Sequence, residues 1–521
     1  MTSAESFDLI VVGGGMGGLA AAALAQRVGL RVALLESHTK LGGCAGYFGR
    51  GPYTFDVGAT ALMGLAPGEP LGDLLRCVGL DFEAARTSSY RVVLPDRSLD
   101  VVADPSAFEA ACAVAFPGRE RERRAFWRLQ GWAGQTLFDA AAHVPRFPIR
   151  SVGDLAHNLR VLGVPGVLAG TLSALTVGGM LRWLGLADDR AFVAFIAMLL
   201  QDTAQAGPET VPFANASACL QAYRLGMSRP RGGMRALVEG LGSRFAALGG
   251  DLRTATLVER VERVEDGFVV MTRRRQKLRG RQVAFNLPLD RAAALLGRSL
   301  NGRLGGRERR SRAVWSAFTG YLAIDRAAVA DDSPLFHQVL QSYDGPIHDG
   351  NNVLISLSPP DDPGYGPPGV RVATLSTHVA PGDWDGLDAE SYRAKKQEYS
   401  QRLLAALGRA LPDAPRRLWH AEFASPRSFA RYTRRVLGAV GGPPVRRGNS
   451  NFLAAGSDVF GPGLWVVGDS VFPGQGTLAV ALSAVRVVER ITGRNWPALR
   501  GSRYDRASSP IRPDEGEFLD A

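Results

Sequence analysis

The chain has few residues of the kinds that bind metals or form cross-links. It contains 4 cysteines and 7 histidines in 521 residues. Cys44, Cys77, Cys112 and Cys219 lie far apart, and no CxxC pair is present. This spacing excludes a zinc-finger framework and a dense disulfide scaffold, and it suits a reducing compartment. We therefore expect no metal site.

The N-terminus lacks the pattern of a cleavable signal peptide. Such a peptide has a basic start, an apolar stretch and a small-residue cleavage site. Here Glu5 and Asp8 precede the first apolar run, and that run continues directly into a glycine motif. We expect the bulk of the protein to be cytoplasmic.

Acidic residues are outnumbered, because 61 Lys and Arg against 50 Asp and Glu give a net charge of +11. Arginines gather at residues 273–281 and 307–312. An ordinary solvated surface explains this excess slightly better than binding to anionic lipid headgroups does. No zinc-finger, helix-turn-helix or RNA-binding pattern accompanies the charge, so we expect no nucleic-acid partner.

The length and the composition predict a multidomain soluble enzyme. With 46% hydrophobic and 21% charged residues the chain can bury a core, and 521 residues exceed the usual single domain. We expect an α/β fold in which a discontinuous, Rossmann-type FAD domain is interleaved with an α+β substrate domain that faces the membrane. The FAD domain is predicted at 1–90, 226–300 and 445–499, the substrate domain at 91–225 and 301–444, and a mobile tail at 500–521.

A dinucleotide-binding motif opens the chain. An apolar strand at residues 7–12 runs into Gly13, Gly15 and Gly18, an alanine-rich helix follows, and a second strand ends at Glu36. In this arrangement the glycines let the backbone approach a pyrophosphate at a helix N-terminus, and the acid binds the ribose hydroxyls. An acid rather than an arginine at position 36 argues against a 2′-phosphate.

Further glycine motifs favour FAD over NAD. Gly42 and Gly43 mark a second close approach of the chain to a ligand. Near the C-terminus a strand at 464–467 leads into Gly468 and Asp469, whose carboxylate is placed to bind a ribityl hydroxyl. Gly476 then opens a helix at residues 477–491. The N-terminus of that helix, at Thr477 and Leu478, is expected to face the pyrimidine end of a flavin and to favour its reduced anion.

One long segment without charge suggests contact with an apolar partner. Residues 161–181 carry no charged side chain before Arg182 and approach the length of a membrane span, but they include Pro165, five glycines and three hydroxyl residues. We expect an interfacial or tunnel-lining helix, with residues 191–200 beside it. A plain core helix is the alternative, and a true span is least favoured.

These motifs together resemble the amine-oxidase and phytoene-desaturase superfamily of FAD proteins over nearly the whole chain. The resemblance implies that the backbone of Val258 contacts the adenine. Segments 336–338, 376–384, 425–433 and 472–476 are similar to carotenoid 3,4-desaturases and carotenoid isomerases. Phytoene desaturases usually carry an arginine soon after the glycine pair, where this chain has Cys44-Ala45-Gly46. A later step on a conjugated carotenoid therefore fits better than the first desaturation of phytoene.

The resemblance implies desaturation of a carotenoid at C-3,4, with hydride transfer to flavin N5 and reoxidation by a quinone or oxygen. The candidate catalytic residues are His378, Arg431, Tyr432 and Arg434, with an ordinary structural role as the alternative for each. A cation delocalised along a polyene needs no strong base. Catalysis is then expected to depend on positioning the substrate and excluding water. The enzyme is expected at the membrane surface, which holds the apolar substrate.

Three other functions remain open at this point. A carotenoid or retinoid isomerase or saturase would use reduced flavin and differ only in its product. A flavin-bound carotenoid carrier would have no need of a helix directed at the flavin ring. An amine oxidase is expected to have an aromatic cage near its flavin, and the sequence shows none.

Overall fold

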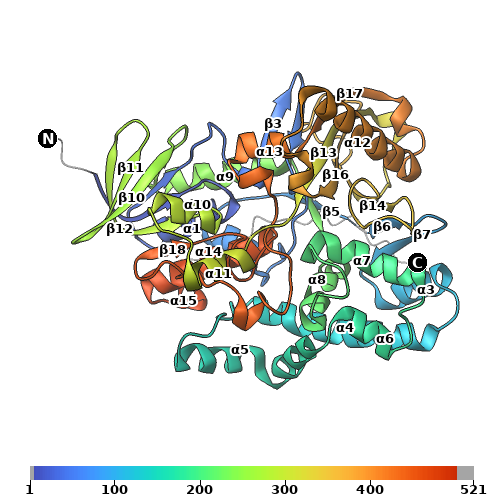
Figure 1. Ribbon diagram of the computed structural model, residues 1–521, viewed down its shortest axis with the longest axis horizontal. Coiled ribbons are helices and arrows are strands. Elements are labelled where there is room, and N and C mark those ends of the chain that lie inside the picture. The colour runs from blue at the N-terminus through green and yellow to red at the C-terminus, as the bar shows by residue number, and fades with distance from the viewer. Residues whose placement is uncertain (1–4, 88, 502–521) are drawn as a thin grey trace.

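The computed structural model describes residues 5–87 and 89–501. Residues 500 and 501 of the expected tail end a short helix, and the rest of that tail, 502–521, lies outside the described residues. Two mixed sheets and a layer of helices make up the fold (Figure 1). The predicted α/β architecture is confirmed. Its shorter elements are β3 (Tyr47–Arg50), β4 (Tyr53–Asp56), α2 (Pro70–Cys77), β5 (Ala84–Arg86), β8 (Ser228–Pro230), α10 (Leu289–Leu295), α11 (Gly302–Arg310), α13 (Pro426–Thr433) and α15 (Trp496–Gly501).

The first sheet gathers strands from three distant parts of the chain. Its order is β10 (Val258–Val264), β11 (Gly267–Thr272), β12 (Lys277–Phe285), β1 (Glu5–Val12), β2 (Val32–Leu35) and β9 (Asp251–Arg253), and β18 (Leu464–Val466) pairs with β12. β1 runs parallel to β2 and β12, and it is buried on both faces, as is usual for a central parallel strand.

Three helices cover one face of this sheet. α1 (Met16–Arg27) contacts both α9 (Gly233–Ala247) and α14 (Thr477–Thr492). Successive side chains of a strand point to opposite faces. Leu9 and Val11 therefore pack in the core with these helices, whereas Ile10 and Val12 pack in the core that includes α10.

The second sheet is mostly antiparallel. Its order is β17 (Leu418–Ala424), β13 (Ser316–Asp325), β16 (Val370–Val379), β15 (Asn352–Leu357), β14 (Phe336–Leu340), β6 (Ser89–Val93) and β7 (Ser98–Val102). The long helix α12 (Ala389–Ala410) contributes Leu403 and Leu407 to the core of this sheet. The domain boundary expected at residue 90 falls within β6.

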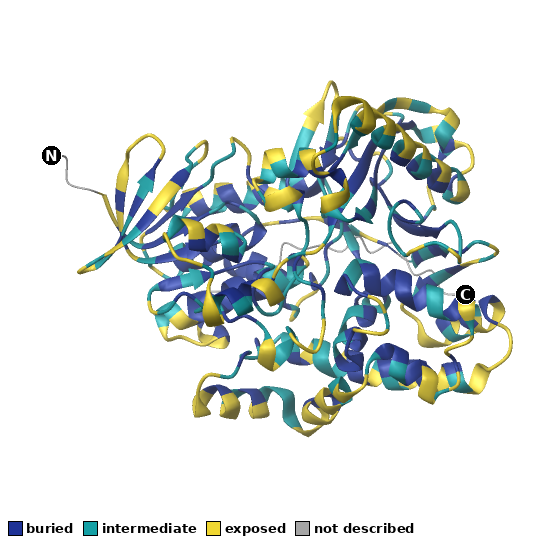
Figure 2. Cartoon of the chain, in the orientation of Figure 1, coloured by how far each residue is buried: buried dark blue, intermediate teal, exposed yellow. Residues whose placement is uncertain are grey.

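The helical layer consists of α3 (Pro105–Ala115), α4 (Glu120–Ala141), α5 (Val152–Thr171), α6 (Val177–Trp183), α7 (Arg190–Ala204) and α8 (Phe213–Leu225). The expectation that residues 191–200 belong to an interfacial or tunnel-lining surface is wrong, because they are largely buried and none of them lines the cavity described below. Phe192, Phe195 and Ile196 are fully buried, because α7 packs into the core of this layer (Figure 2).

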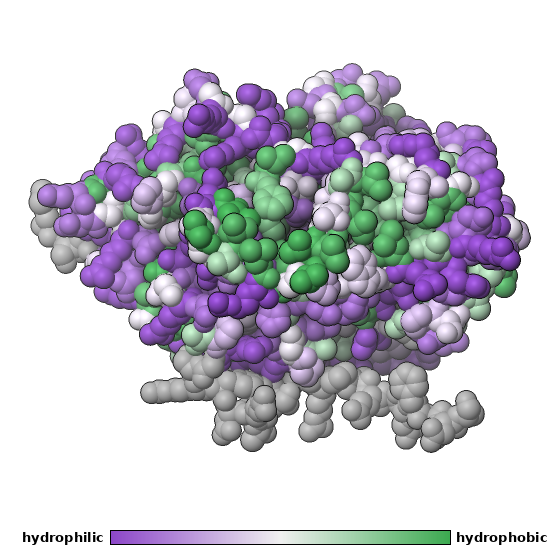
Figure 3. All heavy atoms as spheres, turned by 90° about the horizontal axis from the view of Figure 1, so that it is seen from below, coloured by the Kyte–Doolittle hydropathy of each residue, from purple (hydrophilic) through white to green (hydrophobic). Residues whose placement is uncertain are grey.

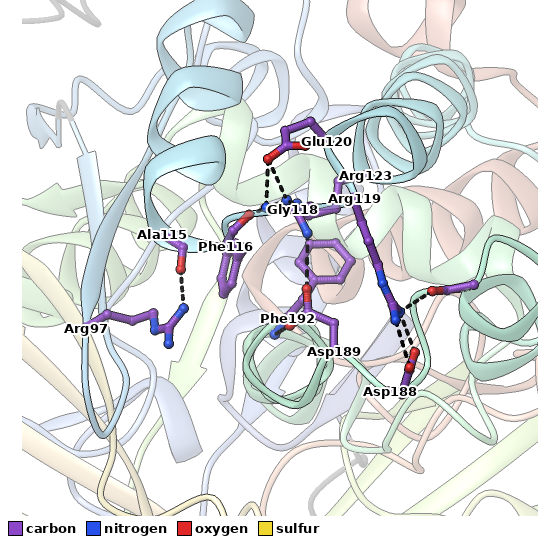
Figure 4. Close-up of polar contacts among 11 residues, drawn as sticks. Arg97, Ala115, Phe116, Gly118, Arg119, Glu120, Arg123, Asp188, Asp189 and Phe192 are labelled. Carbon is purple, nitrogen blue, oxygen red and sulfur yellow. Dashed lines mark hydrogen bonds and ion pairs between the residues drawn. The ribbon is translucent and has the colours of Figure 1, made fainter.

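Polar contacts fix the start of α7 against the start of α4 (Figure 4). Arg123 is 3% exposed and donates to the carbonyl oxygens of Phe116 and Gly118. Its Nη1 lies 3.1 Å from Asp189 Oδ2, and Asp189 Oδ1 accepts a hydrogen bond from Phe192 N at the first turn of α7. Nearby, Arg119 pairs with Asp188. α7 is thus held in position at its N-terminal end.

The uncharged segment 161–181 is not one helix. It is divided among the end of α5, a short 3₁₀ turn (Leu172–Ala174) and α6. Within α5, Gly163 has a φ of 57° and Pro165 lacks a backbone N–H, so the regular hydrogen-bond ladder is interrupted there. Among the residues that the structure describes, no helix is long and apolar enough to cross a bilayer.

Candidate functional site

A single cavity of about 1980 Å³ connects the first sheet, the second sheet and the helical layer. This volume is roughly twice the upper range of usual ligand pockets, about 1000 Å³. We call the part lined by the glycine motifs and Glu36 the dinucleotide end, and the part lined by α5, α7 and α8 the helical end. The predicted cofactor residues that line the cavity are Gly13, Gly15, Glu36, Gly42, Gly43, Val258, Gly468, Asp469, Gly476, Thr477 and Leu478.

The turn between β1 and α1 has no room for side chains. A Cβ atom on Gly13, whose φ is +104°, would lie 2.8 Å from the carbonyl oxygen of Asn286. Gly18, which does not line the cavity, packs beneath the turn, and a Cβ there would lie 2.1 Å from the carbonyl oxygen of Gly13. The bare backbone of this turn and the N-terminus of α1 therefore face the cavity, an arrangement that fits a pyrophosphate.

The predicted ribose ligand stands at the end of β2. Glu36 Oε2 accepts a hydrogen bond of 2.7 Å from Gly14 N, and Oε1 accepts one of 2.6 Å from His38 N. Gly42 N donates to the carbonyl oxygen of Gly14 at 2.8 Å, so the second glycine pair lies against the first. Val258 is buried at the start of β10. These positions suit the adenosine half of a dinucleotide.

Asp469 is held by an arginine that the sequence analysis missed. Arg435 Nη2 lies 2.7 Å from Asp469 Oδ2, and Arg435 Nη1 donates to the carbonyl oxygen of Gly441 at 3.1 Å. Burial lowers the pKa of Arg435, but the interaction with Asp469, together with smaller contributions from Cys44 and Asp290, raises the pKa above its ordinary value. Cys44, which follows the glycine pair, carries a neutral thiol because burial raises its pKa.

The predicted catalytic cluster is divided by the fold. Arg431, Tyr432 and Arg434 line the cavity from α13 and its C-cap, but they are exposed, and the Tyr432 side chain is 57% accessible. His378 lies inside, on β16, with Nε2 at 3.4 Å from Gln205 Nε2. Burial, with a smaller contribution from His348, lowers the pKa of His378 to about 4, so its ring is neutral at neutral pH.

The start of α14 is tied to the end of α7. Gln475, just before Gly476, donates from Nε2 to the carbonyl oxygens of Asp202 at 3.0 Å and Thr203 at 2.8 Å. α14 begins at Thr477 with no acidic residue in its first turn, so its positive dipole end is not neutralised there. The two ends of the cavity therefore meet beside this helix N-terminus.

The cavity wall includes residues that the sequence analysis did not predict, among them Asp202, Tyr223, Asn286 and Arg435. Two signals were available. Asn286 ends an apolar strand and precedes Pro288, and Asp202 is the one acidic residue within the mostly apolar segment 191–204. Asn286 packs against the glycine turn and donates from Nδ2 to the carbonyl oxygen of Val467 at 2.9 Å. It thereby joins both glycine motifs.

Residues 11–78 match the family model of the NAD(P)-binding Rossmann-like domain. β1, α1 and β2 therefore form a dinucleotide-binding unit.

The chain is similar over most of its length to two proteins whose names refer to carotenoid chemistry. The chain is 25% identical to a chloroplastic prolycopene isomerase of Arabidopsis thaliana, over 93% of this chain and 82% of the relative. It is 26% identical to a phytoene dehydrogenase of Streptomyces griseus, over 93% of this chain and 95% of that protein.

A solved structure supports the fold. A putrescine oxidase bound to putrescine superposes with a TM-score of 0.63 at 18% identity, over 94% of this chain and 99% of that one. At this identity the likeness extends to the fold alone. The two relatives and the dinucleotide-binding unit identify the chain as an enzyme of the FAD oxidoreductase superfamily that contains the phytoene desaturases and the carotenoid isomerases.

Proposed function

We propose that the protein binds FAD at the dinucleotide end and uses it to desaturate a long apolar carotenoid, at C-3,4 as the first choice. The observation that carries this proposal is the single large cavity, which joins a dinucleotide site to an apolar, helix-lined space. When bound, FAD supplies an acceptor for hydride. A dinucleotide and a polyene can occupy the two ends together.

The residues of the chain have distinct roles in this proposal. Glu36 binds the ribose, Asp469 binds the ribityl chain, and Arg435 orients Asp469. The N-terminus of α14 stabilises negative charge on the flavin. His378 stays neutral above a pH of about 4 and is able to accept a proton beside Gln205. The apolar walls exclude water.

A second candidate function is isomerisation or saturation of a carotenoid. It is favoured by the similarity to a protein named prolycopene isomerase and by the absence of an arginine at positions 44–46. Both functions require the same cofactor and the same substrate class. Only the product separates them.

The test is to incubate FAD-loaded protein with carotenoids in liposomes plus a quinone, with oxygen as a separate acceptor arm. A loss of two hydrogens in the product mass with a red-shifted spectrum is the expected result. Unchanged mass with altered geometry indicates an isomerase, and a gain of two hydrogens indicates a saturase. Flavin reduction by an amine, without any reaction of carotenoids, contradicts both polyene functions.

The proposed site of membrane contact is α5. Leu159, Val164 and Leu168 are more than half exposed, with Val164 at 74%, and Phe452 and Leu453 add further apolar surface. Hydrophobic side chains gather on the face of the molecule seen from below (Figure 3). Leu159 also lines the cavity, so the cavity opens beside this apolar surface. Such an opening gives an apolar substrate a path from a bilayer.

Replacing two of these side chains tests the membrane contact. The double variant Leu159→Glu and Val164→Glu is expected to lower the fraction of protein that sediments with liposomes by roughly tenfold or more. Val114→Glu is the matched control, because Val114 is 84% exposed on α3, outside this surface. Equal sedimentation of the two variants contradicts the proposed membrane contact.

A further inference from the structure

Asp202 is an acidic side chain at the helical end of the cavity. It lies on the last turns of α7 and lines the cavity together with Tyr223 of α8. Its Oδ2 accepts a hydrogen bond of 2.9 Å from the Tyr223 hydroxyl. Within residues 5–87 and 89–501, no donor lies within hydrogen-bonding distance of Asp202 Oδ1, and this oxygen is accessible from the cavity. One acceptor position is thus open to a ligand.

The Asp202 carboxylate has no positive partner among the described residues. The cavity wall carries nine Lys and Arg side chains but only four acidic ones, Glu36, Asp202, Glu422 and Asp469. Glu36 accepts from backbone amides, Glu422 pairs with Arg50, and Asp469 pairs with Arg435. Burial raises the pKa of Asp202 to about 6, and the Tyr223 hydrogen bond only partly offsets this effect.

The surroundings of Asp202 are largely apolar and aromatic. Tyr90 and Tyr223 meet edge to face with ring centroids 4.7 Å apart, and Met227 and Phe336 line the same region. Tyr90 already donates to Gln338 Oε1 at 3.1 Å, so its proton is not directed to Asp202. A carboxylate without a counter-charge in such a place destabilises the fold, and a ligand that donates a hydrogen bond to it offsets part of this cost.

We propose that Asp202 and Tyr223 form a subsite that binds a hydroxyl group at one end of an otherwise apolar substrate. The inference rests on the proposed function. Asp202 Oδ1 accepts the hydrogen bond of the ligand hydroxyl, and the Tyr223 oxygen offers a second acceptor. A site built to pair a substrate hydroxyl discriminates against the analogue that lacks it. An ammonium group is a poorer match, because the cavity wall is mainly basic.

This subsite also sets which bond of the substrate lies beside α14. The backbone carbonyl of Asp202 is held by Gln475, and Gln475 directly precedes Gly476 and Thr477. The distance from the subsite to the N-terminus of α14 is therefore fixed by a direct contact between the two segments. A substrate anchored at its hydroxyl places one particular section of its chain at that point, and regioselectivity follows from the anchor.

The test compares three ligands on FAD-loaded protein: a hydrocarbon polyene, its hydroxylated analogue of equal length, and an amine-ended analogue. Dissociation constants come from quenching of tryptophan fluorescence, and kcat/KM comes from product formation. The unmodified protein is expected to bind the hydroxylated polyene roughly 10- to 100-fold more tightly than the hydrocarbon. Asp202→Leu is expected to remove this preference while the affinity for the hydrocarbon stays within about threefold.

Two further variants keep the test decisive. Tyr223→Phe retains the aromatic contact, and its preference for the hydroxylated polyene is expected to be about tenfold smaller than that of the unmodified protein. This variant still tests the subsite if Asp202→Leu does not fold. Asp188→Asn is the matched control, because it removes an exposed carboxylate just before α7 that faces Arg119 rather than the cavity (Figure 4). It is expected to leave the preference unchanged.

The outcomes separate the two proposals. Equal binding of hydrocarbon and hydroxylated polyene, or a preference that survives both Asp202→Leu and Tyr223→Phe, overturns the subsite and leaves the proposed function standing. Binding of neither polyene overturns the proposed function and the subsite with it. Tight binding of the amine alone, lost in Asp202→Leu, overturns both in favour of an amine site.

Discussion

The dinucleotide end of the cavity is formed mainly by backbone, whereas the helical end is formed by side chains from distant segments. Gly13, Gly15, Gly42 and Gly43 contribute no side chains, and their role is to let the main chain approach a ligand. At the helical end, Asp202 and Tyr223 belong to different helices and meet through one hydrogen bond. Few substitutions are tolerated where the backbone forms the site. Where side chains form the site, a single substitution can change which ligand is preferred.

The largest effect is expected at the glycine turn. Gly18→Val places side-chain atoms where even a Cβ lies 2.1 Å from the Gly13 carbonyl oxygen, so the turn has to shift. We expect purified protein to lose nearly all of its flavin, measured as the ratio of flavin to protein absorbance. Gly382→Ala, where a Cβ meets nothing within 4 Å, serves as the control. A normal flavin content in Gly18→Val would show that this end is less constrained than we propose.

The second-largest effect concerns a buried ion pair between β4 and β8, away from the cavity wall. Asp56 and Arg229 are both fully buried, and Arg229 Nη2 lies 3.0 Å from Asp56 Oδ2. The Tyr365 hydroxyl donates to the same Oδ2 at 3.0 Å. Asp56→Asn leaves the guanidinium without a counter-charge, and we expect a loss of about 3–5 kcal/mol in the free energy of unfolding.

Denaturant titration measures this loss. Asp100→Asn breaks a pair with Arg91 that is one-third or more exposed on both sides, and it is expected to cost about 1 kcal/mol or less. Similar losses in the two variants would indicate that the Asp56 network contributes little to stability.

The third effect is a loss of flavin affinity at Arg435, and the adjacent Arg434 provides the control. Arg435 is paired with Asp469 inside the cavity, whereas Arg434 is exposed. Arg435→Gln leaves Asp469 unpaired, and we expect flavin to bind roughly 100-fold more weakly. Arg434→Gln is expected to change flavin affinity by less than about threefold. Flavin fluorescence titration measures both constants, and equal constants would contradict the role of Arg435.

The smallest effect is a change in pH dependence at the helical end. The pKa of Asp202 is about 6 in the folded protein and near 4 when unfolded, so its ionisation destabilises the fold as the pH rises through this interval. We expect Asp202→Asn to be more stable than the unmodified protein by about 1–2 kcal/mol above pH 6 and equal to it near pH 4. Melting temperatures at both pH values test this difference, and a gain of the same size at pH 4 argues against it.

The dinucleotide half could be predicted because its information is local. Gly13, Gly15, Gly18 and Glu36 belong to one continuous unit of strand, turn, helix and strand. Their spacing predicts this order of elements, which the structure has. The helix at 161–181 was predicted less well. Its uncharged composition is visible, but the break at Gly163 depends on a backbone conformation that packing selects.

The sequence by itself determined the α/β class, the dinucleotide-binding unit and the apolar character of the other half, since each follows from residues near one another in the chain. Only the tertiary structure decided that Arg435 rather than Arg434 reaches Asp469, and that Asp202 meets Tyr223. Adjacent arginines differ in direction because the chain leaves α13 through a left-handed residue at Arg434. Such directions depend on long-range packing, which local spacing does not encode.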